Sequence, residues 1–178
     1  MQTKLSNSLS PLSKVWVYAA NRVFNATEAA EINELAKQFA GQWTAHKQQL
    51  SSDGGLLYNC FIVLMVDESM AGASGCSIDS SVRFVKEIGT KYQADFFNRM
   101  LLYYVDESNQ MQILPFNEAS TVFAQGIIND STEVFNHLVN TKESFEATWK
   151  VSLAKSPLLK FVASSQPSFN LSLLSGGK

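Results

Sequence analysis

The stretch Phe61-Ile62-Val63-Leu64-Met65-Val66 is a run of six apolar residues, which is typical of a strand buried on both faces. We expect this strand to begin near residue 57. A segment rich in glycine, alanine and serine follows at residues 71–81, and residues 82–89 then have the spacing of a helix that ends at Gly89. Turns from a strand into a helix leave backbone N–H groups free and often hold ligands or nucleophiles. This turn is therefore the first place to look for a site.

Upstream of that stretch, the pattern predicts one strand and one amphipathic helix. Residues 15–18 are β-branched and aromatic, which favours a strand. A helix is expected from Thr27, as its N-cap, with the sequence Asp53-Gly54-Gly55 marking its end. Its apolar stripe consists of Ile32, Leu35, Ala36, Phe39, Ala40, Trp43 and, further on, Leu50.

Downstream, the pattern predicts a hairpin and two more helices. Residues 100–105 and 110–114 flank a polar turn and read as two paired strands. A helix is expected over 117–125, capped by an asparagine and closed by a glycine. Residues 132–139 are predicted as a strand, although a helix would also accept their pattern. Thr141 then caps a last helix.

This order of elements predicts a single globular domain over residues 14–155, of the α/β or α+β class. We expect a mixed sheet of about five strands, with some parallel pairs and with helices packed on it. Residues 1–13 are predicted to be a flexible tail, and residues 156–178, rich in serine, glutamine and glycine, a poorly ordered one.

The composition of the chain argues against some classes of function. The chain has 178 residues, 46% of them hydrophobic and 17% charged, with a net charge of −2, which fits one globular domain and argues against a nucleic-acid partner. We expect no membrane association, because no apolar run approaches the roughly 20 residues of a membrane span. Without a recognisable signal peptide at its start, the protein is expected in the cytoplasm. Cys60 and Cys76 are then free thiols, with Cys60 buried.

Nucleotide hydrolysis is disfavoured by the motifs. A phosphate-binding P-loop needs a Gly-Lys pair that opens a helix, and the chain has this pair only at residues 177–178. Asp67 and Glu68 after the apolar strand imitate a Walker B motif without its partner. The two histidines and two cysteines lack the spacing of metal ligands, so we expect no metal and no cofactor.

Cys76 is a candidate catalytic nucleophile. It lies just before the predicted helix, whose positive end favours a thiolate. Arg83 follows it by seven positions, one more than in a cysteine-phosphatase loop. His46 is a candidate partner for the thiol, although nothing in the sequence brings the two together. The alternative is a small residue packed under a tight turn.

The same turn is a candidate ligand-binding site. With Ser77 as N-cap, its backbone amides and hydroxyls would suit a phosphate or carboxylate. The alternative is that these side chains cap the helix themselves. The candidate ligand-binding residues are Ser74, Gly75, Ser77, Asp79, Ser80, Ser81, Arg83 and Trp43. Trp43 either lines a pocket with His46 or is a core tryptophan with the histidine at its edge.

The string Ser74-Gly75-Cys76-Ser77-Ile78-Asp79-Ser80-Ser81 carries a resemblance. Together with segments 15–22, 42–46, 61–64 and 66–68, it resembles a family of uncharacterised short bacterial proteins, over about residues 15–149. Members of this family are often labelled ABC transporter ATPases. That label would imply ATP binding and hydrolysis, but the Walker A loop is missing here, so the resemblance supplies a family and no activity.

Three functional hypotheses follow. The first is a binding module for a small ligand or a protein that uses the turn at residues 74–81. The second is a thiol-dependent enzyme with Cys76 as nucleophile. The third is a structural or scaffolding protein, which includes the case of a homo-oligomer.

Overall fold

The computed structural model of the chain describes residues 5, 8–69 and 74–164. Within them the chain has an α+β fold with helices packed on β-sheets, which confirms the predicted fold class. Its strands are β1 (Lys14–Ala19), β2 (Thr44–Ala45), β3 (Gln48–Gln49), β4 (Ser51–Leu57), β5 (Phe61–Asp67), β6 (Leu101–Val105), β7 (Met111–Pro115), β8 (Glu133–Phe135) and β9 (Lys150–Ser152). Its helices are α1 (Ala26–Gln42), α2 (Gly75–Tyr92), α3 (Ala119–Ala124), α4 (Lys142–Thr148) and α5 (Leu159–Ser164), with 3₁₀ turns η1 (Phe116–Glu118) and η2 (Leu153–Lys155).

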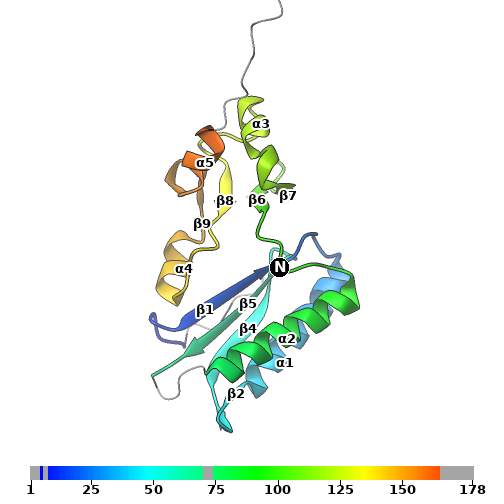
Figure 1. The fold of residues 1–178 in the computed structure, drawn as a ribbon, viewed down its shortest axis with the longest axis vertical. Helices are drawn as coiled ribbons and strands as arrows, with labels where there is room; N and C mark the ends of the chain where they lie inside the picture. The colour runs from blue at the N-terminus through cyan, green and yellow to red at the C-terminus, as the bar shows by residue number, and fades with distance from the viewer. Residues whose placement is uncertain (1–4, 6–7, 70–73, 165–178) are drawn as a thin grey trace, which may run out of the picture.

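The strands form three sheets in place of the expected single mixed sheet. Their orders are β1-β5-β4, β2-β3 and β7-β6-β8-β9, and every strand pair among the described residues is antiparallel. β1 and β4, which α1 connects, do run in the same direction, since both are antiparallel to β5. The expected parallel pair does not form because β5 lies between them (Figure 1).

The predicted strand over 57–66 is two strands joined by a tight turn. The Cys60 N–H donates to the Leu57 carbonyl at 3.1 Å, and Tyr58 and Asn59 between them have φ of 50° and 53°. Positive φ at both central residues matches the turn to the twist of a hairpin. The usual Asn-Gly signal is absent, so nothing in the local sequence marks this turn just before the apolar run.

The predicted helix end at residues 53–55 is wrong, because these residues lie in β4 and α1 ends at Gln42. A Cβ on Gly54 would lie 2.7 Å from Cδ2 of Leu64 and 3.0 Å from the carbonyl oxygen of Ala36. Glycine therefore occurs here because α1 packs directly on the strand.

The helix caps also differ from prediction. The N-cap of α1 is Asn25, not Thr27, and it forms a reciprocal capping box with Glu28. α2 continues through Gly89, the predicted end, to Tyr92. Its C-cap residue, Gln93, has a left-handed backbone conformation with φ 53°. A helical Gly89 leaves room for the returning chain, since a Cβ there would lie 2.6 Å from the Ala94 carbonyl oxygen.

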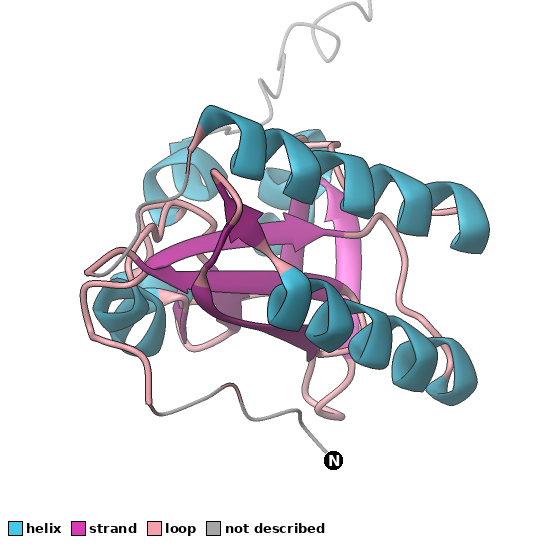
Figure 2. Ribbon diagram, turned by 90° about the horizontal axis from the view of Figure 1, so that it is seen from below, coloured by secondary structure: helices cyan, strands magenta, loops and turns pink. Residues whose placement is uncertain are grey.

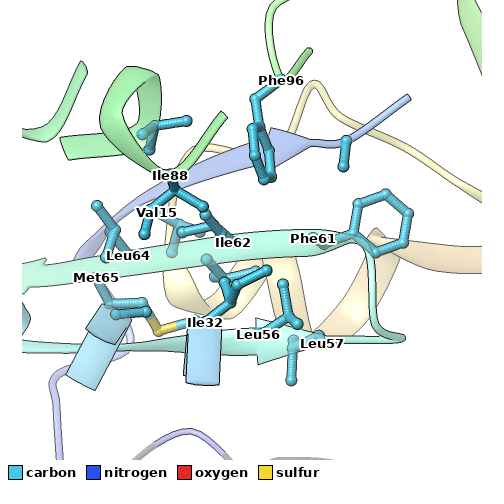
Figure 3. Packing of buried hydrophobic residues seen from close by; sticks show 14 of the residues in the cluster. Val15, Ile32, Leu56, Leu57, Phe61, Ile62, Leu64, Met65, Ile88 and Phe96 are labelled. Atoms are coloured by element: carbon cyan, nitrogen blue, oxygen red, sulfur yellow. The ribbon is translucent and has the colours of Figure 1, made fainter. Parts of the chain in front are cut away.

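α1 and α2 cover one face of the β1-β5-β4 sheet. Figure 3 shows Ile62 and Leu64 of β5 beside Ile32 of α1 and Ile88 of α2. All four side chains are buried. The stripe predicted for α1 therefore faces the sheet, as expected for an amphipathic helix.

The four-stranded sheet separates two apolar cores, and Figure 2 shows helices outside the strands. Because side chains alternate along a strand, Tyr103 of β6 and Phe135 of β8 join the core of the first sheet. Leu102 of β6 and Val134 of β8 face the other way, into a second core with α3 and α5. The hairpin predicted at 100–114 is confirmed, and residues 133–135 of the ambiguous segment 132–139 are a strand.

An aromatic cluster joins the β1-β5-β4 sheet to the four-stranded sheet. The Phe61 ring centroid lies 5.0 Å from that of Tyr103, 4.8 Å from that of Phe135 and 5.2 Å from that of Trp149. The Tyr103 hydroxyl donates to the Ala20 carbonyl at 3.1 Å, just beyond β1. These contacts fix the sheets against each other.

Both predicted tails contain packed residues. Leu9 is buried in the first core, and Nζ of the buried Lys142 donates to its carbonyl at 2.8 Å. Near the other end, α5 buries Val162 in the second core. Residues 165–178, the rest of the predicted C-terminal tail, lie outside the described residues. Thr141 caps α4 as predicted.

The predictions for residues 117–126 have mixed outcomes. The helix expected over 117–125 is shorter and starts as the 3₁₀ turn η1, with no side-chain cap. The glycine that closes it, Gly126, has φ 73°, as a C-terminal glycine should.

Candidate functional site

The candidate turn is the capped start of α2. Its N-cap is Ser74, one helical turn earlier than predicted: the Ser77 N–H donates to Oγ of Ser74 at 3.3 Å, and Oγ of Ser77 donates to the Ser74 carbonyl at 2.7 Å. The residues just before the cap, 70–73, lie outside the described part of the chain.

The other two serine hydroxyls are also engaged. Oγ of Ser80 donates to the Ser77 carbonyl and Oγ of Ser81 to the Ile78 carbonyl, each at 2.7 Å. The hydroxyls of Ser81 and Tyr18 share a further hydrogen bond of 2.9 Å, and burial raises the pKa of Tyr18. Hydroxyls that already donate to carbonyls offer a ligand only acceptor lone pairs. The geometry therefore favours the self-capping alternative over an anion cradle.

Trp43 is part of the core and contacts the first turn of α2 from the interior of the protein. It is 2% exposed, and its Nε1–H donates to the Ser77 carbonyl at 2.9 Å. The rings of Trp16 and Phe39 flank it, with centroids at 5.6 and 5.2 Å. The indole thus ties the end of α1 to the first turn of α2.

The two candidate catalytic residues are both exposed and lie on different elements. Cys76 is exposed in the first turn of α2. His46 is exposed in the turn of the β2-β3 ribbon, with φ of 49°. Within the described residues, no hydrogen bond or ion pair connects His46 to Cys76.

Asp67, which imitates a Walker B residue, holds a local turn. Its Oδ1 accepts the Ser69 N–H at 2.9 Å and its Oδ2 accepts the Ser10 N–H at 3.3 Å. These hydrogen bonds, those from Ser69 first, hold the pKa of the Asp67 carboxyl below its usual value. Its oxygens thus have backbone partners at the end of β5.

Five exposed residues of α2 form one continuous stripe, which we call the α2 face. They are Cys76, Asp79, Arg83, Lys86 and Thr90. Their spacing of three or four residues places them on one side of the helix. Gly75, also exposed, adjoins the stripe at its start. Of the predicted ligand-binding residues, then, Gly75, Asp79 and Arg83 are exposed, whereas Trp43, Ser77 and Ser81 are buried.

The α2 face runs into a shallow surface depression of about 610 Å³. Lys86 and Thr90 line it from the helix, and Phe97 lines it from the loop after α2. Phe97 is 42% exposed, and its ring centroid lies 5.9 Å from Nζ of Lys86 and 6.0 Å from the Tyr18 centroid. Sequence reasoning missed this depression, because the pair Phe96-Phe97 does not reveal that the first ring is buried and the second exposed.

Neither a metal-ion site nor a membrane-spanning helix occurs among the described residues. No group of three or more histidine, cysteine, aspartate or glutamate side chains in that part of the chain could hold a metal ion. None of the helices described is long and apolar enough to cross a membrane.

Comparisons with known proteins add no assignment: no family model, no curated protein and no solved structure matches the chain.

Proposed function

We propose that the chain is a protein-binding module whose binding surface is the α2 face together with the depression beside Phe97. The observation that carries this proposal is the half-exposed Phe97 ring in an open depression continuous with a charged helix face. Aromatic residues that are partly exposed beside charged ones are the usual anchors of protein interfaces.

A protein partner suits this surface better than a small ligand does. Small-molecule sites enclose most of the ligand surface, whereas this depression is shallow. The hydroxyls of Ser77, Ser80 and Ser81 donate to carbonyls, so these three supply no donors for a bound anion. The α2 start is nevertheless held firmly by Trp43, which presents Asp79 and Arg83 in fixed positions.

The surface indicates the chemistry of the partner. An apolar side chain would pack on Phe97, and a carboxylate would be attracted by Arg83 and Lys86. We further propose the cytoplasm as the location, since both cysteines are free thiols.

Site-specific photo-crosslinking in cells tests the proposal. A crosslinking amino acid placed at Thr90, at the rim of the depression, is expected to give a discrete adduct with one protein. The matched control is the same amino acid at Gln38, an exposed position on α1. Equal adducts from both positions, or none from Thr90, would contradict the proposal.

The captured protein then allows a quantitative test with purified components. Phe97→Ala is expected to weaken binding at least about tenfold, as truncation of an interface anchor does, and Arg83→Glu is expected to slow association. Gln38→Ala should leave the dissociation constant unchanged. Unchanged binding by Phe97→Ala, measured by calorimetry, would remove the depression from the proposed surface.

A further inference from the structure

β7 is an edge strand whose outer backbone groups are unpaired. It lies at one margin of the four-stranded sheet, opposite β9 (Figure 1). The Asp106 N–H donates to the Gln110 carbonyl at 2.9 Å, and the Phe116 N–H donates to the Met100 carbonyl at 2.8 Å. Because hydrogen-bonded pairs alternate in an antiparallel ladder, Gln112 and Leu114 also bond to β6. Met111 and Ile113 therefore point their N–H and C=O groups outward.

These outward groups have no hydrogen-bond partner among the described residues. The edge of β4 differs, since the Leu56 N–H donates to Oδ1 of Asn33 at 3.1 Å. The edge of β1 is partly covered as well, because the Val15 N–H donates to the Asn140 carbonyl.

β7 also lacks the charge that the other edge strands of the three- and four-stranded sheets carry. β1 carries Lys14, β4 carries Asp53 and β9 carries Lys150, whereas β7 has the uncharged sequence Met111-Gln112-Ile113-Leu114-Pro115. Charged residues on edge strands disfavour pairing with another strand. Met111 and Ile113 are also only partly buried against the first core, so a further strand would cover their side chains.

We infer that β7 pairs antiparallel with β7 of a second copy of this chain. With Met111 of one copy opposite Ile113 of the other, both residues of each copy exchange N–H···O=C bonds, so all four outward N–H groups are paired. The two-fold axis passes between the two Gln112 residues, and no like charges meet in the paired strands. Pro115, which lacks an N–H, limits the pairing at its end.

Two measurements on the unmodified chain test this inference. Light scattering after size exclusion is expected to show the mass approach twice 19.7 kDa as concentration rises. Amide hydrogen exchange, read by NMR, should slow at least about tenfold at Met111 and Ile113 in the dimer. The outward amides of Lys150 and Ser152 on β9 should not change. A monomer at every concentration, or a dimer without protection at Met111 and Ile113, would overturn the inference.

Two proline substitutions, one on each edge of the sheet, serve as the test variant and its matched control. Ile113→Pro removes one outward donor of β7 without touching the ladder to β6, and it should abolish the dimer. Ser152→Pro makes the same change on the opposite edge, where φ of −62° already suits proline, and the dimer should persist. A dimer retained by Ile113→Pro contradicts the inference. Should that variant fail to fold, the exchange measurement on the unmodified chain decides.

Discussion

At the scale of single residues, side chains that look functional in the sequence are used to build the structure. Trp43, Ser77 and Ser81 are candidate ligand-binding residues, and all three are buried with hydrogen-bond partners inside the molecule. Their residue types are those of a binding loop, but their environments are those of a helix cap and a core. Burial therefore decides which of the candidate residues a partner could contact.

The Trp43 hydrogen bond to Ser77 should contribute measurably to stability. Trp43→Phe removes the indole donor to the Ser77 carbonyl, which keeps its hydrogen bond from Oγ of Ser80, so the loss should cost about 0.5–1.5 kcal/mol. We expect a lower free energy of unfolding in urea and faster amide exchange in the first turn of α2. Trp16→Phe is the control, because it alters a neighbouring ring whose N–H makes no hydrogen bond within the described residues. Equal exchange rates at α2 in the two variants would refute the role given to the indole N–H.

The two thiols should differ in accessibility. Cys76 is exposed and Cys60 is fully buried, where burial raises the pKa of its thiol. An alkylating reagent is expected to label Cys76 in the native protein and Cys60 only after unfolding, as read by mass spectrometry. Slow labelling of Cys76 would also count against the hypothesis of a thiol-dependent enzyme.

His137 should make stability depend on pH. His137 is exposed as a residue, but its ring lies against the buried rings of Phe61 and Tyr103, with centroids at 5.4 and 5.1 Å, and the partial loss of water around the ring lowers the pKa of His137 to about 4. The unfolded chain, with a histidine pKa of about 6.5, binds the proton more readily than the folded chain does. Stability is therefore lost as pH falls from about 6.5 to about 4.

Thermal unfolding across this range checks the prediction. The melting temperature should fall in the native chain and fall less in His137→Gln. The pKa of Glu28 is lowered to about 2, first by its hydrogen bonds to Arg22, so its contribution to stability begins to fall below about pH 4.5, at the lower end of this range, and does so equally in both proteins. Parallel curves for the two proteins would show that His137 is not the cause.

At the scale of elements, the sequence predicts what is locally encoded and misses what depends on distant contacts. The apolar stripe of α1, the hairpin at 100–114 and the Thr141 cap all follow from spacing within a few residues, and all are found. The turn at Tyr58 and Asn59 was hidden, because neither residue is the glycine that such turns favour. The position of β5 between β1 and β4 has no local signal at all.

Gly54 illustrates such a distant constraint, and it gives a prediction at this scale. Gly54→Ala forces a Cβ against Leu64 and α1, and overpacking of this kind costs about 1–3 kcal/mol. Gly41→Ala in α1, where a Cβ meets nothing within 4 Å, should be neutral or stabilise by up to about 1 kcal/mol. Urea unfolding of both variants decides, and a Gly54→Ala protein as stable as Gly41→Ala would contradict the packing argument.

At the scale of the whole molecule, two apolar cores share one sheet. β6 is buried on both faces, with Tyr103 in the first core and Leu102 in the second. Phe61 connects the sheets through its contacts with Tyr103, Phe135 and Trp149. The candidate binding surface lies on the first core alone, where α2 and Phe97 meet. Sequence reasoning placed the start of this helix one turn too late, and it could not predict which side of the helix faces solvent.

We therefore expect the two cores to unfold together. Tryptophan fluorescence and far-ultraviolet circular dichroism should give coincident unfolding curves. Phe61→Ala should lower the free energy of unfolding by about 3–5 kcal/mol, as removal of a buried aromatic ring does. Separate transitions in the native protein would show instead that the cores are independent.

The hydrogen bond from Lys142 to Leu9 has a consequence for how the chain is made. It joins residues 133 positions apart, and two backbone amides of α4 also donate to the same N-terminal segment. The strands of the first sheet, with α1 and α2, end at Tyr92, so they can pair while the rest is still being synthesised, and Tyr103, Phe135 and Trp149 complete their core later. The Leu9 carbonyl receives its donor from Lys142 only after α4 has left the ribosome. The first residues translated are thus among the last to reach their native positions, and closing this long loop is a late step in folding.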